Sequence, residues 1–254
     1  MVKTWVLLRG LTREQAHWGE FPSTLAQALP GTRIVTVDLP GAGQLRHQAC
    51  PWRVEAMVQA CRDQLAEAGA APPYALLGLS LGGMVASAWA RAWPQELAAL
   101  VLVNTSLRPY SPPGRRLRAA LWPQLLRLLA SDRGAEEAIL RLTSSRPERH
   151  AQALACWQAV RESRPVSRAN ALRQLLAAAR YRWSGPAPAL PLLLACSEGD
   201  RLVDPGCSRL IARAWSAEIV SHPRAGHDLP LDDGPWLAQR IAQWQAAQRV
   251  APAR

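Results

Sequence analysis

Residues 74–92 read YALLGLSLGGMVASAWARA and place the pattern Gly-x-Ser-x-Gly, from Gly78 to Gly82, between two apolar runs. The first run has the length of a buried strand and the second that of a buried helix. A serine on such a tight strand-to-helix turn presents its hydroxyl above the carboxyl edge of a sheet. The helix that follows points its N-terminus at the same place, which favours a developing negative charge. We therefore expect Ser80 to be a nucleophile; a glycine-rich turn with a spectator serine is the weaker interpretation.

The alternation of short apolar runs and longer helical stretches continues on both sides of this turn. Such a pattern is typical of parallel strands joined by crossover helices. The run at 97–103 is almost wholly apolar, as a central strand buried on both faces should be. The sequence therefore predicts an α/β protein with a mostly parallel, doubly wound sheet. We expect strands at 4–8, 33–37, 74–79, 97–103, 192–195 and 218–220, and helices at 21–29, 54–68, 81–92, 207–215 and 236–247.

The region from 108 to 185 departs from this alternation. Proline-rich joints bracket it, and it contains no convincing strand, only helical patterns at 117–129, 135–142, 151–160 and 169–181. We therefore expect a helical cap inserted after the strand that ends near Asn104. In this division residues 1–107 form the first part of the core, 108–185 the cap and 186–254 the second part of the core.

Positive charge is concentrated in the helical region. The chain has 254 residues, a formal net charge of +11, and 49% hydrophobic against 19% charged residues, which fits a globular enzyme. Residues 108–183 hold 15 arginines and five carboxylates, so the rest of the chain is close to neutral. A protein that coats nucleic acid without sequence preference would be basic all over, and we expect no nucleic-acid partner.

The remaining composition bears on compartment and cofactors. The five cysteines are odd in number and lack CxxC spacing, which indicates reduced thiols in the cytoplasm and no metal site. The uncharged run at 68–90 is broken by Pro72-Pro73 and by four small residues in its centre, so we expect no membrane span. The chain has no HExxH, P-loop or dinucleotide-binding glycine pattern, and no metal or organic cofactor is expected.

A serine nucleophile needs a base and an orienting carboxylate, which should follow it in the chain order serine, acid, histidine. Asp200 lies just beyond the strand expected at 192–195, and we take it as the acid, with Asp204 as the spare and Glu198 aimed elsewhere. His227 follows Gly226 in the last loop, ahead of the closing helix, and is the expected base.

With Ser80, Asp200 and His227 in this order, the chain resembles an α/β-hydrolase of the single-domain, cap-bearing kind over nearly its whole length. The layout is similar to that of small bacterial esterases, including pimeloyl-acyl-carrier-protein methyl esterases and SHCHC synthases. The resemblance implies that these residues are nucleophile, acid and base. It also implies that the backbone N–H groups of Leu11 and Leu81 form the oxyanion hole. One departure is that Arg9-Gly10 stands where the family usually has His-Gly.

Substrate contacts follow from the loop after the first strand and from the cap. Arg9 could hold an anionic substrate group, although a surface arginine bracing the loop is the simpler interpretation, and Trp18 is expected as a pocket wall or a core residue. Trp122 and Trp157, with Trp183, are expected either to line an apolar acyl channel or to pack the cap on the core. The cap arginines could dock an acidic acyl-carrier protein or coenzyme A, with a solvated arginine-rich face as the alternative.

Three functions are compatible with these residues. The leading one is hydrolysis of carboxylic esters, or thioesters, of small to medium acyl groups through a Ser-His-Asp triad and an acyl-enzyme. The second keeps the triad but performs lyase or synthase chemistry of the SHCHC-synthase kind. The third is a ligand-binding protein on a hydrolase scaffold without catalysis. Ester turnover that depends on Ser80 separates the first from the other two.

Overall fold

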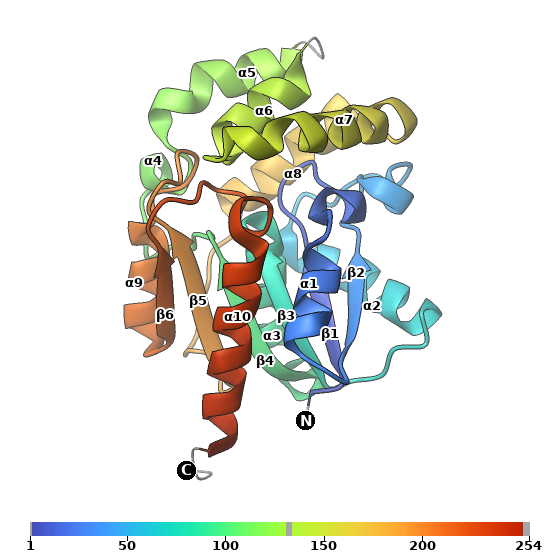
Figure 1. Cartoon of the computed structure of the whole chain (residues 1–254). Coiled ribbons are helices and arrows are strands. Elements are labelled where there is room, and N and C mark those ends of the chain that lie inside the picture. The colour runs from blue at the N-terminus through green and yellow to red at the C-terminus, as the bar shows by residue number, and fades with distance from the viewer. Residues whose placement is uncertain (1, 131–133, 251–254) are drawn as a thin grey trace.

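The computed structural model describes residues 2–130 and 134–250 of the chain. Six parallel strands form one twisted sheet in the order β2-β1-β3-β4-β5-β6, with helices on both faces (Figure 1). The α/β prediction is therefore confirmed. The strands are β1 Thr4–Leu8, β2 Arg33–Val37, β3 Tyr74–Leu79, β4 Leu97–Val103, β5 Leu192–Ser197 and β6 Glu218–His222.

The centre of the sheet is built from the most apolar stretches of the chain. Every residue of β1 and β3 is buried, because helices cover these strands on both faces. Leu8 pairs with Gly78, and Leu79 pairs with Val103, so β1, β3 and β4 end at nearly the same level. The loops that follow these strands consequently meet above one edge of the sheet.

Two apolar layers hold the sheet between its helices. On one face lie α1 (Phe21–Ala28) and α10 (Leu229–Val250), whose side chains share a cluster with Trp5 and Leu7 of β1. On the other face lie α2 (Met57–Glu67), α3 (Leu81–Ala92) and α9 (Gly206–Trp215). Alternate residues of each strand thus point into different clusters, as the two-residue period of a strand requires.

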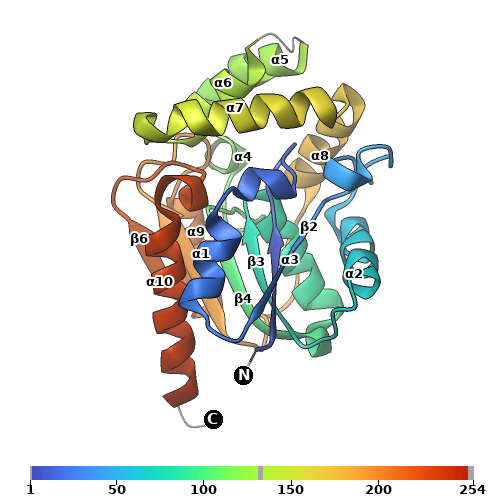
Figure 2. The same ribbon diagram turned by 45° about the vertical axis from the view of Figure 1, so that its right-hand side comes forward.

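The helical insertion lies across the carboxyl edge of the sheet. Figure 2 shows its long helices above the ends of the strands, at the opposite end of the molecule from the two chain termini. The segments that enter and leave the insertion meet where Arg108 bridges Arg182, and the N–H of Trp183 donates to the carbonyl of Arg108 at 2.7 Å. Its helices are α4 Pro113–Arg116, α5 Trp122–Ala130, α6 Ala135–Thr143, α7 Pro147–Ser163 and α8 Arg168–Arg180.

Helix boundaries differ from the expected ones where proline acts. The helix expected at 117–129 is divided into a 3-10 turn, Ala119–Leu121, and α5, because Pro123 has no N–H to donate to a preceding turn and suits the start of a helix. The closing helix, expected at 236–247, is preceded by a turn that breaks at Asp233, just before Pro235. None of the helices in the described ranges combines the length and apolar character that a membrane crossing requires.

Candidate active site

Ser80 occupies the turn between β3 and α3 in a backbone conformation that few residues other than glycine adopt, with φ 57° and ψ −116°. The turn is tight enough to require glycine on both sides. A Cβ on Gly78 would lie 2.4 Å from the carbonyl oxygen of Gly82, and a Cβ on Gly82 would lie 2.1 Å from that of Leu8. The Gly-x-Ser-x-Gly spacing therefore has a steric cause in this structure.

Besides the bonds that its carbonyl accepts within the first turn of α3, two hydrogen bonds to other segments hold the backbone of this strained residue. The N–H of Ser80 donates to the carbonyl of Val103 at 2.9 Å, which extends the pairing of β3 with β4 beyond the last strand residue. The hydroxyl of Thr105 donates to the carbonyl of Ser80 at 2.7 Å. Val103 is the last residue of β4 and Thr105 lies two residues further on. The geometry of the turn therefore depends on the neighbouring strand as well as on its own glycines.

Asp200 and His227 meet in the loops after β5 and β6. Nδ1 of His227 lies 2.7 Å from Oδ2 of Asp200, and both residues are buried, at 5% and 2% exposure. The other carboxylate oxygen, Oδ1, accepts from the backbone N–H groups of Leu202 and Val203 at 2.8 and 2.9 Å. These bonds leave Asp200 one orientation, in which its free oxygen faces the imidazole. The pair can hold the imidazole with Nε2 available to a nucleophile.

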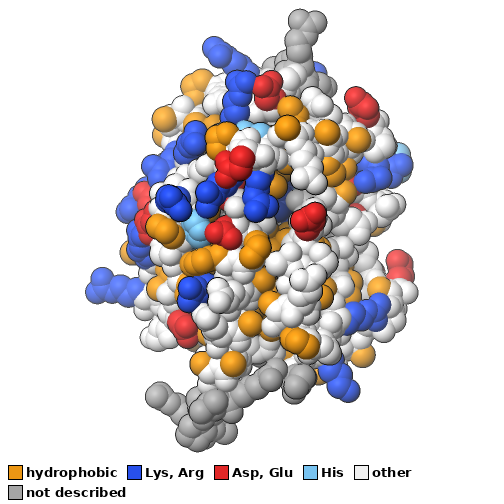
Figure 3. Space-filling model, in the orientation of Figure 1, with side chains coloured by type: hydrophobic (Ala, Val, Ile, Leu, Met, Phe, Trp, Pro, Cys, Tyr) orange, Lys and Arg blue, Asp and Glu red, His pale blue; other side chains and the backbone are white. Residues whose placement is uncertain are grey.

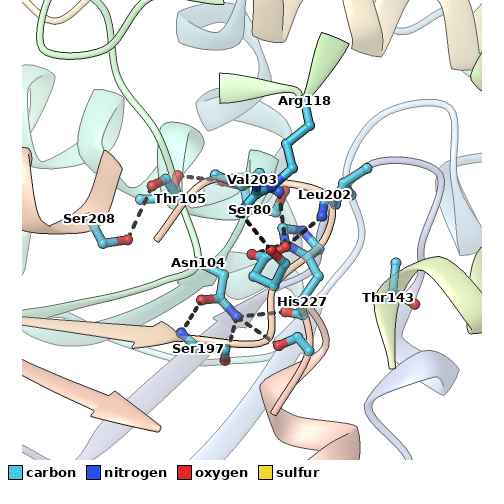
Figure 4. A network of polar contacts seen from close by, with 12 residues as sticks. Ser80, Asn104, Thr105, Arg118, Thr143, Ser197, Leu202, Val203, Ser208 and His227 are labelled. Atoms are coloured by element: carbon cyan, nitrogen blue, oxygen red, sulfur yellow. Dashed lines mark hydrogen bonds and ion pairs between the residues drawn. The ribbon is translucent and has the colours of Figure 1, made fainter. Parts of the chain in front are cut away.

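Asn104, which directly follows β4, lies beside His227 and contacts the histidine loop (Figure 4). Its side-chain NH₂ donates to the carbonyl of His227 at 2.8 Å and to the hydroxyl of Ser197 at 3.0 Å. Its side-chain oxygen accepts from the N–H of Ser197 at 2.9 Å. An amide can satisfy this mixture of donors and acceptors, whereas a carboxylate has no N–H to give. Asn104 therefore holds the loop that carries His227.

The competing acids and the second histidine have other partners. Glu198 binds Arg209 and the hydroxyl of Ser221, and Asp204 binds Arg115 and accepts from the N–H of Gly206 at the start of α9. The imidazole of His222 lies between the backbone N–H of Ala225 and the carboxylate of Asp233. In the described ranges no group of three or more His, Cys, Asp or Glu side chains is arranged to hold a metal ion.

Two cavities meet at Ser80 beneath the cap. The smaller, of about 90 Å³, is lined by Ser80, His227 and Leu11. The larger, of about 380 Å³, is lined by Ser80, Leu11 and Leu81 together with side chains of α5 and α8. The two residues expected to form an oxyanion hole thus lie beside the serine in the same cavity.

Arg9 is not the surface residue that the simpler interpretation expected. Its side chain is 2% exposed, and its guanidinium forms two bonds to Asp228, from Nη1 to Oδ1 at 3.0 Å and from Nη2 to Oδ2 at 2.6 Å. It also lies over the ring of Trp18, 4.8 Å from the ring centroid. Arg9 thus joins the end of β1 to the residue after His227, and its charge is already matched within the protein. Nothing in the local sequence marks Asp228 for this role.

The tryptophans divide between cavity and core. Trp122 is 48% exposed and lines the larger cavity, and Trp157 lines the smaller one, where Arg13 lies over its ring at 4.6 Å. Trp18 packs against Phe21 in the core, with 5.6 Å between ring centroids. Trp183 packs against Trp215 in the apolar cluster that also contains side chains of α3 and α9.

Polar contacts that the sequence did not indicate attach the cap to the loops around Ser80 and His227. The carboxylate of Asp232 accepts from the hydroxyl of Ser144 and from the N–H groups of Ser145 and Gly226, at 2.5 to 2.8 Å. Glu136 of α6 binds Arg13, with 2.6 Å between Oε2 and Nη1, and both side chains are buried. The contacts of Asp232 with Ser144 and Ser145 and of Arg13 with Glu136 show no motif, because they join residues 87 to 123 positions apart.

His17 lies in the same charged surroundings. Burial lowers the pKa of this histidine well below its ordinary 6.5, and the nearby guanidinium groups of Arg13 and Arg9 add to the effect. Its Nδ1 accepts from the backbone N–H of Glu14 at 3.1 Å. The ring is therefore neutral in the folded protein.

Comparisons with known proteins agree with this architecture. A family model described as the alpha/beta hydrolase family matches residues 5–240. A pimeloyl-[acyl-carrier protein] methyl ester esterase of Chromobacterium violaceum is 28% identical over 89% of this chain and 78% of its own length. The polyketide synthase ThaQ of Burkholderia thailandensis is also 28% identical, over 79% of this chain, which spans only 10% of that much longer protein.

The fold is likewise that of solved hydrolases. The structure of a thermophilic esterase from Thermogutta terrifontis superposes with a TM-score of 0.75 at 23% identity, covering 96% of this chain and 90% of the esterase. A match at this identity concerns the fold alone. The family match covers most of the chain, and it agrees with the parallel sheet and the serine turn. The chain belongs to the alpha/beta hydrolase family.

Proposed function

We propose that this protein is a serine hydrolase that cleaves carboxylic esters, with Ser80 as nucleophile, His227 as base and Asp200 as the acid that orients it. The observation that carries the proposal is the 2.7 Å contact between Nδ1 of His227 and Oδ2 of Asp200, beside a cavity that His227 shares with Ser80. The esterase among the relatives supports the same reaction class.

The reaction begins when His227 accepts the proton of Ser80 as the serine oxygen attacks the ester carbonyl. The carbonyl oxygen becomes an oxyanion, which the N–H groups of Leu11 and Leu81 stabilise by about 3–4 kcal/mol for each donor. His227 then gives the proton to the leaving alcohol, and the acyl group stays on Ser80. A water molecule, deprotonated by His227, attacks this acyl-enzyme and releases the acid. Asp200 holds the imidazole in the required tautomer in both halves.

The two cavities suggest how a substrate lies. The cavity of about 380 Å³ is lined mainly by leucine and alanine side chains, which suit an acyl chain of small to medium length. The cavity of about 90 Å³ contains His227, which must reach the leaving oxygen, and its small volume suits a small alcohol or thiol. We therefore place the acyl group in the larger cavity and the leaving group in the smaller one.

The proposal includes a partner. An acidic acyl-carrier protein or coenzyme A would bring the acyl group and bind to the arginine-rich cap. Arg127, Arg149 and Arg180 are exposed on the cap and offer guanidinium groups for carboxylates or phosphates. Other cap arginines are paired, as Arg141 is with Glu137, and Figure 3 shows basic and acidic side chains interspersed on this face.

The five cysteines are free thiols, which supports the cytoplasmic location that we propose.

The test is hydrolysis of p-nitrophenyl esters from acetate to laurate by the wild type and by Ser80→Ala. We expect a maximum at a medium chain length and a loss of at least about 1,000-fold in the variant, because the acyl-enzyme cannot form. Ser87→Ala is the matched control, since Ser87 is a buried serine of α3, the helix that follows Ser80, and its hydroxyl donates to the carbonyl of Gly83. Turnover that survives Ser80→Ala, or none at any length, would contradict the proposal and favour the lyase or binding-protein alternatives.

A further inference from the structure

The larger cavity beside Ser80 contains one charged side chain in otherwise apolar walls. Its lining consists of leucine, methionine, alanine, valine, proline and tryptophan side chains, apart from Ser80, Ser106 and Arg116. A plain acyl chain would need no cation there, because an alkyl group gains nothing from a guanidinium. Arg116 therefore requires an explanation of its own.

Arg116 is buried without an anionic partner in the described part of the chain. Its side chain is 8% exposed, Nη1 donates to the carbonyl of Ala179 at 3.2 Å and Nη2 to that of Ala178 at 2.7 Å. Its Nε–H, also buried, has no acceptor among the described residues. Two other buried arginines near the site, Arg9 and Arg13, each face a carboxylate.

The surroundings make this charge unfavourable in the empty protein. Burial, together with the nearby charge of Arg108, lowers the pKa of Arg116 to about 10, so the guanidinium stays charged at neutral pH. Two neutral carbonyls compensate only part of the desolvation of a cation, which an anion at hydrogen-bond distance would complete.

Helix capping alone does not account for these facts. The carbonyls of Ala178 and Ala179 belong to the last turn of α8, where free carbonyls attract a cation. That role uses Nη1 and Nη2 and could be filled by a side chain facing solvent. It leaves unexplained why the residue lines the cavity and why Nε has no acceptor.

We propose that Arg116 binds a carboxylate carried by the acyl chain, so that the preferred substrates are half-esters of dicarboxylic acids. This inference rests on the proposed function, because it assumes that the acyl chain lies in the larger cavity with its ester carbonyl at Ser80. The ester end reacts at Ser80, and the carboxylate at the other end of the chain accepts from Nε–H of Arg116.

Ser106 offers a second donor for the same carboxylate. Ser106 lines the cavity, and its buried hydroxyl has no hydrogen-bond partner among the described residues. A hydroxyl can donate to a carboxylate oxygen that the guanidinium leaves free. Nε of Arg116 and Oγ of Ser106, which both lack a partner among the described residues, thus have a common use.

The experiment compares mono-p-nitrophenyl esters of dicarboxylic acids with p-nitrophenyl esters of monocarboxylic acids of equal chain length. The wild type should show a higher kcat/KM for the half-ester at one or two chain lengths. Arg116→Met, which keeps the length of the side chain and removes the charge, should lower the ratio of the two kcat/KM values by about 10- to 100-fold. Because both substrates meet the same sample, the ratio does not depend on how much of the variant is folded.

Two further variants sharpen the result. Arg115→Met removes the same charge from the neighbouring residue of α4, which is exposed and paired with Asp204, and should leave the ratio unchanged. Arg116→Lys keeps the charge and should retain part of the preference. A wild type that favours the neutral esters, or an Arg116→Met variant that loses both activities in equal proportion, would overturn the inference and leave Arg116 as a helix cap.

A binding measurement separates this inference from the proposed function. If neither ester series is hydrolysed, the proposed function fails, and calorimetry with octanoate and 1-octanol decides about Arg116 alone. Octanoate should bind the wild type more tightly than 1-octanol and should lose that preference in Arg116→Met. A preference that persists in the variant would place the carboxylate elsewhere and overturn the inference.

Discussion

Different forces stabilise the sheet core and the layer of the cap that α6 and α7 form. Among the described residues, 30 and 20 buried apolar side chains form the clusters on the two faces of the sheet, whereas the cluster between α6 and α7 contains three, Leu140, Ala153 and Trp157. The layer is attached to the core by buried polar contacts instead. Arg13 binds Glu136, and Glu14 binds Arg164 at 2.7 Å.

This difference has a consequence for the site. Apolar burial is not directional, so the sheet keeps its register through many small contacts. Buried ion pairs and hydrogen bonds hold only in one geometry. The polar contacts of the cap reach the segments that carry Leu11 and His227. Arg13, two residues after Leu11, binds Glu136, and the N–H of Asp228 donates to the carbonyl of Thr143 at 2.7 Å. The position of the cap is therefore coupled to the loops that carry Leu11 and His227.

The largest expected effect concerns the core side of the comparison. Asp200→Asn should lower kcat by about 10,000-fold, because an amide in place of the carboxylate favours the wrong tautomer of His227 and cannot stabilise its cation. The backbone donors of Leu202 and Val203 can still bind the remaining oxygen, so the fold should be kept. Ester hydrolysis under saturating substrate, with circular dichroism as a check on folding, measures this.

Asp204→Asn is the matched control for that substitution. Asp204 lies four residues further along and pairs with the exposed Arg115, so its kcat should change by no more than a few fold. If Asp204→Asn lowered kcat more than Asp200→Asn, the assignment of the acid would be wrong.

The next effect breaks the attachment of the cap. Glu136→Gln leaves the buried guanidinium of Arg13 without its carboxylate and should lower the free energy of unfolding by about 3–5 kcal/mol. Urea unfolding gives this value, and limited proteolysis within α6 and α7 should show whether the cap opens first.

Glu137→Gln serves as the control on the same helix. Its carboxylate pairs with Arg141 one turn away, and both side chains are half exposed or more, so the expected loss is about 0.5 kcal/mol or less. Equal losses in the two variants would show that the buried pair does not anchor the cap.

A pH dependence should follow from His17, beneath the cap. The folded protein resists protonation of this ring, whereas the unfolded chain takes up the proton near the ordinary pKa of 6.5. The free energy of unfolding should therefore fall as the pH drops below about 6.5, by up to about 1.4 kcal/mol per pH unit. In His17→Gln, the free energy of unfolding should fall less steeply between pH 7 and 5 than in the wild type. His47→Gln, at an exposed position, should keep the slope of the wild type. Identical slopes in the wild type and His17→Gln would refute the assignment.

The smallest effect concerns a single helix of the cap. The hydroxyl of Ser167 accepts from the N–H of Asn170 at 3.1 Å and caps the N-terminus of α8. Ser167→Ala should lower the free energy of unfolding by about 1 kcal/mol. Ser163→Ala, which removes a hydroxyl near the end of α7 that donates only to backbone carbonyls, should change it less. A larger loss in Ser163→Ala would contradict this ranking.

Much of the core could be predicted from local pattern. The strands expected at 4–8, 33–37, 74–79 and 97–103 have the observed bounds, because a buried parallel strand is a short apolar run between turn residues. The contact of Asp200 with His227 was expected from their positions after two strands of one sheet, whose carboxyl ends lie at the same edge. The catalytic roles of these residues remain predictions.

The sequence by itself determined the order of strands and helices, the serine turn with its two required glycines, and the loops on which acid and base lie. These features depend on residues that are neighbours along the chain, where steric limits and hydrophobic period act. Only the tertiary structure decided that Arg9 faces Asp228 and that Asp232 joins the cap to the histidine loop. It also decided that Arg116 lies in the cavity with no carboxylate opposite it among the described residues. The interaction energy of a buried charge depends on the groups that surround it, and those groups come from segments far apart in the chain.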